Sequence, residues 1–256
     1  MKARPIIIQT SYREVFHQLE DAILRGELKI NEPLPTEAEL CDMFRVKRST
    51  VREGIRLLEQ SGLVTRNSAR RLVVTAPDPS RSSENIIRSV TLNNITLEEL
   101  WRVQRELEAL AGRLASDSIS KPLLDELAAN IEQTRAARDD PKTIVHIDME
   151  FHRLIAQAAN NRALTLARDP LGLLLYASSD FVITRLAQST GRLIAAHQRI
   201  YDAIAANDPE NAARWMLKHM DDFKRGCIMA GAVFDAPVLD FVDPDALAGI
   251  TESLRK

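Results

Sequence analysis

Four side chains in the second half of the chain are of the types that hold a divalent metal ion. Asp148 and His152 stand four residues apart on one expected helix, so both lie on the same face of it. His197 and His219 fall on two further expected helices, beside apolar neighbours that indicate an inward face. Three imidazoles and a carboxylate suit a divalent cation. Zn²⁺, Ni²⁺ and Mn²⁺ all fit these ligand types, and ligand identity alone does not choose among them.

Periodicity alone also permits a second interpretation of these histidines. A single histidine on the apolar face of a helix is usually hydrogen bonded within the core and holds no ligand. The spacing of the four residues therefore leaves a plain polar core open as the alternative to a metal site.

A second group of residues is suited to binding a polyanion. Residues 45–71 contain eight Lys and Arg against two acidic residues, and residues 1–76 carry 13 basic and 10 acidic residues, against 21 and 26 in the remainder. A helix that enters the major groove needs cationic and hydroxyl side chains in its first turns, with flanking cations on phosphates. A solvated helix face is the alternative. We predict DNA contacts from Arg45, Lys47, Arg48, Ser49, Thr50, Arg52, Arg70 and Arg71.

The elements that carry these basic residues have the order of a winged helix-turn-helix domain over residues 9–76. Thr36 with Glu39, and Thr50 with Glu53, have capping-box spacing, which predicts that each pair opens a short helix. Two β-rich pieces flank a polar, basic segment and indicate a hairpin. The expected elements are helices over residues 11–25, 36–44 and 50–61, and strands over residues 63–65 and 72–75.

The remainder of the chain is expected to be helical. Residues 76–83, APDPSRSS, have two prolines and no apolar period, which indicates a linker over residues 77–83. Beyond it we predict an all-α bundle over residues 84–233, in which Pro170 breaks one helix, and then a tail over residues 234–256. The fold class is mostly α.

Composition excludes several classes of protein. With 256 residues, 45% hydrophobic and 27% charged, the chain can bury a core, and disorder throughout is excluded. Met1 to Thr10 lack a signal-peptide pattern, and no apolar run is long enough to cross a membrane, so we expect a cytoplasmic protein. Cys41 and Cys227 are too few for a disulfide framework or a cysteine zinc site.

The segment Leu34 to Val64, LPTEAELCDMFRVKRSTVREGIRLLEQSGLV, resembles the signature of GntR-type bacterial transcription regulators. The resemblance implies a winged domain over about Thr10 to Thr75 that binds operator DNA. It also implies that Arg48, Ser49, Thr50 and Arg52 contact the operator. The chain departs from the family pattern at a DNA-contacting arginine, at a glycine before the third helix and at two wing-tip glycines, which are here Ala38, Arg45, Ala69 and Arg71.

The segments ELWRVQRELEALAGRLAS, DMEFH and AAHQRIYDAIAANDPENAARWMLKHM resemble the FadR C-terminal (FCD) effector domain over about residues 84–230. The resemblance implies that Asp148, His152, His197 and His219 bind a metal, whereas His146 matches no ligand position. An ion that accepts six ligands would keep open positions for water or for the carboxylate of an organic-acid effector.

One further departure concerns the effector. The family commonly has an arginine facing the pocket in its first effector-domain helix, and this chain has neutral Gln104 there, followed by Arg105. Gln supplies hydrogen bonds but no charge. We therefore expect a less acidic effector, or an anionic group held by the metal and another cation. The candidate effector-binding residues are Gln104, Arg105, Arg185 and Arg192.

These observations predict a ligand-responsive DNA-binding transcription regulator that is not an enzyme. Repression is the commoner action in the family, although the sequence does not fix it, and a homodimer is expected because palindromic operators match two-fold proteins. The alternative is a metal-dependent, hydrolase-like enzyme, which lacks an obvious general base because Glu150 points off the ligand face. A storage protein with a basic arm would not explain the pattern of the reading helix.

Overall fold

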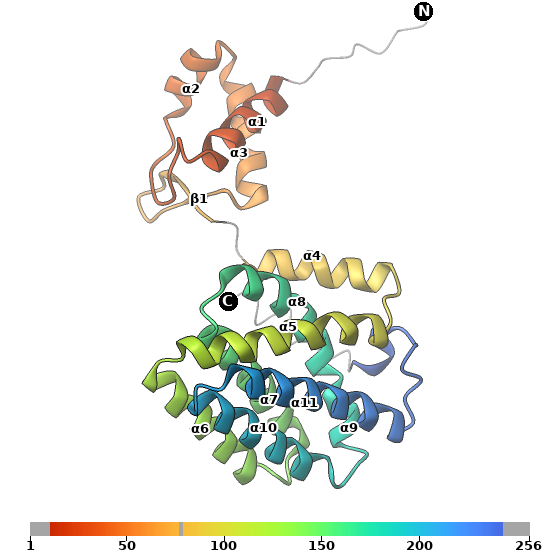
Figure 1. Cartoon of the computed structure of the whole chain (residues 1–256). Coiled ribbons are helices and arrows are strands. Elements are labelled where there is room, and N and C mark those ends of the chain that lie inside the picture. The colour runs from red at the N-terminus through yellow and green to blue at the C-terminus, as the bar shows by residue number, and fades with distance from the viewer. Residues whose placement is uncertain (1–10, 77–78, 243–256) are drawn as a thin grey trace, which may run out of the picture. The chain divides into compact units, whose positions relative to one another are not determined.

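The computed structural model describes residues 11–76 and 79–242, in two compact units that divide between residues 78 and 79 (Figure 1). The helical unit begins earlier than the sequence predicted, because helix α4, Pro79–Leu92, occupies most of the expected linker. Proline is compatible with a first helical turn, where its missing N–H is not needed. Residues 77 and 78 of the expected linker lie outside the described residues.

The first unit is a winged helix-turn-helix, as predicted. Helices α1, Ser11–Leu24, and α3, Arg48–Ser61, pack closely because Gly54 of α3 has no side chain: a Cβ there would lie 2.8 Å from Cγ1 of Val15. Helix α2, Glu37–Phe44, completes the helical part. The strands β1, Val64–Arg66, and β2, Leu72–Val74, form an antiparallel wing.

The ends of these helices test the capping signals in the sequence. The capping box of Thr36 and Glu39 is present at the start of α2, and Gly62 ends α3 with φ of 78°. The prediction that Thr50 opens α3 is wrong, since the helix begins at Arg48 after Lys47. The carbonyl of Lys47 already accepts from the backbone N–H of Val51, so the first turn forms without a side-chain cap. Arg48 and Ser49 therefore lie inside the reading helix.

Arg45 forms the turn between α2 and α3 in a left-handed conformation, with φ of 52° and ψ of 43°. A Cβ is disfavoured in this region by roughly 1–2 kcal/mol, whereas glycine has no such penalty. We expect Arg45→Gly to stabilise the first unit by about 0.5–1 kcal/mol, after the greater freedom of glycine in the unfolded chain is subtracted. The same change should weaken DNA binding if Arg45 contacts the operator. Amide hydrogen exchange of α2 and α3 in the full chain measures the first effect, and slower exchange is the expected result.

The wing turn is built without glycine. Arg70 has φ of 59°, and the side-chain oxygen of Asn67 accepts hydrogen bonds from the backbone N–H groups of Ala69 and Arg71, both at 3.0 Å. Asn67 therefore closes the turn through its side chain, which is a frequent use of asparagine in turns.

The second unit is an all-α bundle around the long helices α5, Leu97–Ser118, and α11, Pro209–Met229, which lie side by side (Figure 1). The other elements are α6, Lys121–Ala136; α7, Pro141–Ala158; α8, Arg162–Ala177; α9, Ser179–Ile183; α10, Ser189–Ala205; and a 3₁₀ turn, Val238–Phe241.

Two predictions about this unit were wrong. Helix α8 continues through Pro170, which is buried, so the surrounding packing outweighs the missing hydrogen bond. Residues 234–242, which were expected to belong to a tail, are part of the bundle, because Phe234, Val238 and Val242 are buried in its core. The backbone N–H of Val238 also donates to the carbonyl of Ile95. Residues 243–256 of the expected tail lie outside the described residues.

Candidate functional site

The start of α3 presents cations to solvent. The side chains of Arg48 and Arg52 are 76% and 70% exposed, and both approach the carboxylate of Glu37 on α2. The Arg48 Nε donates to Glu37 Oε2 at 2.7 Å, and the Arg52 Nε lies 3.7 Å from Oε1. Exposed ion pairs contribute little stability. Their effect here is to hold two guanidinium groups together at the start of the reading helix.

The other predicted DNA contacts are also accessible. Thr50 is partly buried, and the remaining seven predicted residues are exposed. Arg45 and Lys47 occupy the turn before α3, and Arg70 and Arg71 occupy the tip of the wing. The first unit thus carries its predicted cations on the turn, the reading helix and the wing, which are the parts of this fold that approach DNA.

The four predicted metal ligands come together in the bundle. Asp148 and His152 project from α7, His197 from α10 and His219 from α11, and one ligand atom from each lies within 4.8 Å of all the others. Nε2 of His152 is 3.1 Å from Nε2 of His219, and Nε2 of His197 is 3.2 Å from Oδ1 of Asp148. All four residues are buried.

Several nitrogen and oxygen atoms of this cluster lack a hydrogen-bond partner, and a bound cation would take the place of one. Oδ1 of Asp148 and both ring nitrogens of His197 have no aligned hydrogen-bond partner among the described residues, despite their burial. Buried polar atoms are costly when left unsatisfied. The ring of His197 is held by stacking on Phe151, with centroids 3.6 Å apart. The residues present therefore fit a divalent ion.

Electrostatics favours the protonation states that a metal requires. Burial lowers the pKa of His219 to about 3 and also lowers the pKa of His197, so both rings are neutral near pH 7. Burial raises the pKa of Asp148, but the neighbouring histidines outweigh it and the net shift is downward. Neutral imidazoles and an ionised carboxylate are the forms that bind cations.

These shifts predict a pH dependence for the metal-free protein. The unfolded state binds a proton at His219 near pH 6.5, whereas the folded state does so only near pH 3, so stability falls as pH decreases between these values. The loss is at most about 1.4 kcal/mol per pH unit for each such histidine. Thermal unfolding in chelator between pH 7.5 and 5 should show this decline, with a shallower slope in His219→Gln. Equal slopes would mean that folding does not shift the pKa of His219.

The buried carboxylate of Glu108 lies beside one of the candidate metal ligands, His152. Oε2 of Glu108 lies 2.8 Å from Nδ1 of His152. Oε1 of Glu108 accepts from Nε of Arg168 at 2.5 Å, from Nε2 of Gln104 at 2.8 Å and from the hydroxyl of Tyr176. Burial opposes ionisation of Glu108, but Arg168 and His152 outweigh it and hold the pKa well below its ordinary value.

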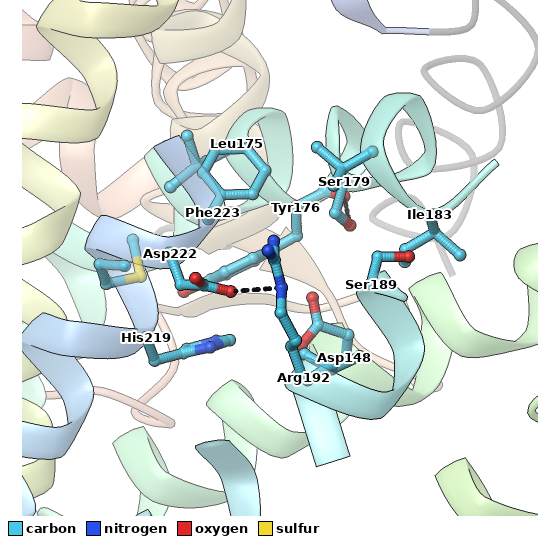
Figure 2. A pocket seen from close by; sticks show the side chains of 13 residues that line it. Asp148, Leu175, Tyr176, Ser179, Ile183, Ser189, Arg192, His219, Asp222 and Phe223 are labelled. Atoms are coloured by element: carbon cyan, nitrogen blue, oxygen red, sulfur yellow. Dashed lines mark hydrogen bonds and ion pairs between the residues drawn. The ribbon is translucent and has the colours of Figure 1, made fainter. Parts of the chain in front are cut away.

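A small cavity adjoins the metal ligands (Figure 2). It has a volume of about 60 Å³, and Asp148, His219 and Tyr176 line it together with Arg192, whose Nε lies 3.2 Å from Oδ2 of Asp222. Figure 2 shows Arg192 and Asp222 beside each other, with Asp148 and His219 close by. The cavity therefore places a cation and two ligands of the candidate metal around one space.

Of the four residues predicted to bind an effector, Arg192 lines this cavity and the others do not. Gln104 is buried behind it, donates to Glu108, and has no partner for its own Oε1 among the described residues. Arg105 donates to both carboxylate oxygens of Asp221 on α11, at 2.6 and 3.1 Å. Arg185 is exposed, and its guanidinium lies over the ring of Phe181.

The sequence analysis gave no role in the site to Glu108, Arg168 or Tyr176. One sequence signal could have indicated Arg168: it lies one helical turn after Leu164, which places a charged residue on an apolar face of α8. Gly172 leaves space for two neighbouring side chains, because a Cβ there would lie 3.0 Å from the Tyr176 ring and 3.1 Å from Nε2 of Gln104.

Together, the winged helix-turn-helix unit and the helical bundle define a DNA-binding regulator with an attached sensing domain. Residues 11–74 match the gntR family of bacterial regulatory proteins, and residues 99–222 match the FCD domain. The chain belongs to the GntR family of transcription regulators and carries an FCD domain.

Curated relatives are similar along most of the chain. The Glc operon transcriptional activator of Escherichia coli (strain K12) is 27% identical over 219 residues, which cover 82% of this chain and 86% of that protein. The HTH-type transcriptional repressor NanR of Citrobacter rodentium (strain ICC168) is 27% identical over 229 residues, with 86% of each chain covered.

Among solved structures, Streptococcus agalactiae GntR shares the fold with a TM-score of 0.58 and 22% identity, covering 84% of this chain and 99% of that one. Separately, no helix within the described parts of this chain is long and apolar enough to span a membrane.

Proposed function

We propose that this regulator binds a divalent metal, with Zn²⁺ the first candidate, through Asp148, His152, His197 and His219. We further propose that a small organic acid bound beside the metal changes operator binding. The observation that carries the proposal is the buried cluster in which Oδ1 of Asp148 and Nε2 of His197 face each other without an aligned hydrogen bond. A bound cation would supply Lewis acidity and open coordination positions.

The cavity residues support an effector of limited size and of negative charge. The cavity beside Asp148 and His219 has a volume of about 60 Å³, so we propose a small effector. Arg192 lies on its wall, and its charge is shared with Asp222. The hydroxyls of Ser179 and Ser189 are further polar groups on the lining. We therefore propose a short-chain carboxylic acid, held by the metal and by Arg192.

The remaining features of the proposal concern assembly and action. We propose a homodimer in the cytoplasm that binds a palindromic operator, because two copies of one reading helix match two half-sites. We propose repression as its action. The named relatives include an activator and a repressor, so a reporter gene in a deletion strain must decide the sign.

A metal-dependent enzyme is the second candidate function, and the site favours it less. Hydrolysis at a metal needs a general base near the bound water. Glu108 accepts from Arg168, Gln104 and Tyr176 and lies against Nδ1 of His152, and Glu150 is paired with Arg153. The carboxylates that line the described cavity are Asp148 and Asp222. As general bases both are compromised, because Asp148 is a proposed metal ligand and Asp222 is ion-paired with Arg192.

The proposal for DNA predicts the effect of Arg52→Ala. If Arg52 contacts a base, the change should cost about 1–3 kcal/mol in operator binding and relax specificity at one position. Binding to a selected palindrome and to its single-base variants measures both effects. Arg25→Ala, an exposed arginine at the end of the first helix, is the control and should bind normally. An equal loss on every DNA sequence would make Arg52 a phosphate contact.

The proposal for the effector is tested by DNA binding in four conditions. Fluorescence anisotropy with a selected palindrome would compare metal-loaded and chelated protein, each with and without a panel of short carboxylic acids. We expect one or more acids to shift the operator affinity of the loaded protein and to lose that effect in chelator and in Arg192→Gln. A shift that is unchanged in chelated protein would exclude the metal from effector binding.

A further inference from the structure

We propose that Glu108 is a positioning residue that sets the tautomer of His152 before any metal binds. The inference rests on the proposed metal site and concerns residues outside it. In this arrangement Nδ1 of His152 carries the proton and donates to Glu108, which leaves the lone pair of Nε2 directed at the other ligands. Arg168 and Tyr176 hold Glu108 in the form that imposes this state.

The geometry around His152 places different groups at its two ring nitrogens. Nδ1 lies 2.8 Å from Oε2 of Glu108, and Nε2 lies 3.1 Å from Nε2 of His219 and 3.8 Å from Oδ1 of Asp148. An ionised carboxylate accepts hydrogen bonds and donates none. The ring nitrogen that faces Glu108 must therefore be the protonated one, and Nε2 must be the metal-binding atom.

The surroundings of Glu108 keep it in the accepting form. Arg168, Gln104 and Tyr176 all present donors to Oε1, which leaves Oε2 for His152. Arg168 is 3% exposed and Glu108 is fully buried, so their charges compensate each other within the core. The guanidinium of Arg168 and the NH₂ of Gln104 can only donate, so Glu108 is held as an acceptor, and it takes the same role toward His152 in the proposed arrangement.

The orientation of the His152 ring is fixed as well as its protonation. Tyr176 stacks on His152, with centroids 4.5 Å apart and an interplanar angle of 21°, while its hydroxyl donates to Glu108. Gly172 permits this placement, because a side chain there would meet the tyrosine ring. Tyr176 also lines the cavity described above, so a ligand in the cavity would contact a residue that holds His152 in place.

The tautomer can be measured in the protein without metal. Long-range ¹⁵N–¹H spectra of the imidazole rings distinguish the two neutral forms, and the spectrum of a His152→Gln variant assigns the signals. In chelated wild-type protein we expect His152 to be protonated at Nδ1. Protonation at Nε2 would overturn the proposal, and this result does not depend on whether the site binds metal.

Metal affinity supplies the second readout. By competition with a chromophoric chelator, Glu108→Gln should bind Zn²⁺ roughly 10- to 100-fold more weakly than wild type, as expected for an outer partner of a histidine ligand. The double variant Glu108→Gln/Arg168→Gln restores charge balance and guards against misfolding, and it should show the same loss. Glu106→Gln, a change at an exposed carboxylate of α5, is the matched control and should bind normally.

The experiment distinguishes failure of the proposed metal site from failure of the proposed role of Glu108. If wild-type protein does not bind Zn²⁺, the proposed metal site fails, whereas the tautomer in chelated protein still tests the role of Glu108. If wild-type protein binds Zn²⁺ and both Glu108 variants bind it equally well, the metal site stands and the positioning role of Glu108 is rejected.

Discussion

Replacing His197 with Ala is expected to abolish the stabilisation of the protein by divalent metal. At a free metal concentration 100-fold above Kd, a bound ion stabilises the folded state by about 2.7 kcal/mol. Removing one of four protein ligands should weaken metal binding by more than the roughly 10- to 100-fold associated with an outer partner, so this increment should disappear. Thermal unfolding of wild type and variant, each with Zn²⁺ and with chelator, measures it.

The comparison has an internal control in His146→Ala. His146 is exposed and precedes Asp148 by two residues on the same helix, but it is outside the ligand cluster. This variant should keep the full difference between metal-loaded and chelated protein. The ligand assignment is contradicted if His197→Ala retains that difference, or if both variants lose it equally.

Replacing Arg168 with Met is expected to destabilise the helical unit by about 3–5 kcal/mol at neutral pH. The change keeps an unbranched side chain but leaves Glu108 as a buried carboxylate without its cation, and removing one partner of a buried ion pair typically has this cost. Denaturant unfolding monitored by far-ultraviolet circular dichroism gives the magnitude.

The pH dependence of this destabilisation has a defined sign. In wild type, burial raises the pKa of Glu108, but Arg168 and His152 lower it below its ordinary value, so the ion pair stabilises the folded state above about pH 4.5 and less at lower pH. Without Arg168, the effect of burial on Glu108 is opposed less, so the pKa of Glu108 rises. The folded variant therefore protonates Glu108 more readily than wild type does. The difference in unfolding free energy between wild type and variant should therefore shrink as pH falls from 7 toward 4.

Arg153→Met is the matched control for charge loss at a surface pair. Its partner is Glu150, and the two side chains are 52% and 44% exposed. Exposed pairs of this kind contribute about 0–1 kcal/mol. Similar losses in the Arg153 and Arg168 variants would mean that the buried pair has no special role in stability.

Much of the architecture follows from local signals in the sequence. The spacing of Asp148 and His152 places them on one helical face regardless of how the helix packs, and the apolar neighbours of His197 and His219 turn those residues inward. The capping box of Thr36 and Glu39 likewise acts within four residues, and it is formed. Signals of this kind do not require knowledge of the tertiary structure.

The features that sequence reasoning missed depend on contacts between distant segments. Arg168 donates to Glu108, which lies 60 positions earlier in the sequence, although arginine is a residue type that is usually exposed. Arg105 follows Gln104 directly, but one residue turns an α-helix by about 100°, which directs Arg105 to Asp221 and not to the cavity. The path of α8 through Pro170 is similarly decided by packing in the bundle. The candidate ligands were therefore predictable, whereas the network that holds them was not.

The metal site at the centre of this account is tested most directly by native mass spectrometry joined to elemental analysis. The protein should be purified without chelator or histidine tag, because either could remove or introduce a metal. We predict dimers that carry one divalent ion per chain, lost together with any small organic mass in His197→Ala. A wild-type protein that stays metal-free after incubation with Zn²⁺, Ni²⁺ and Mn²⁺ would contradict the account.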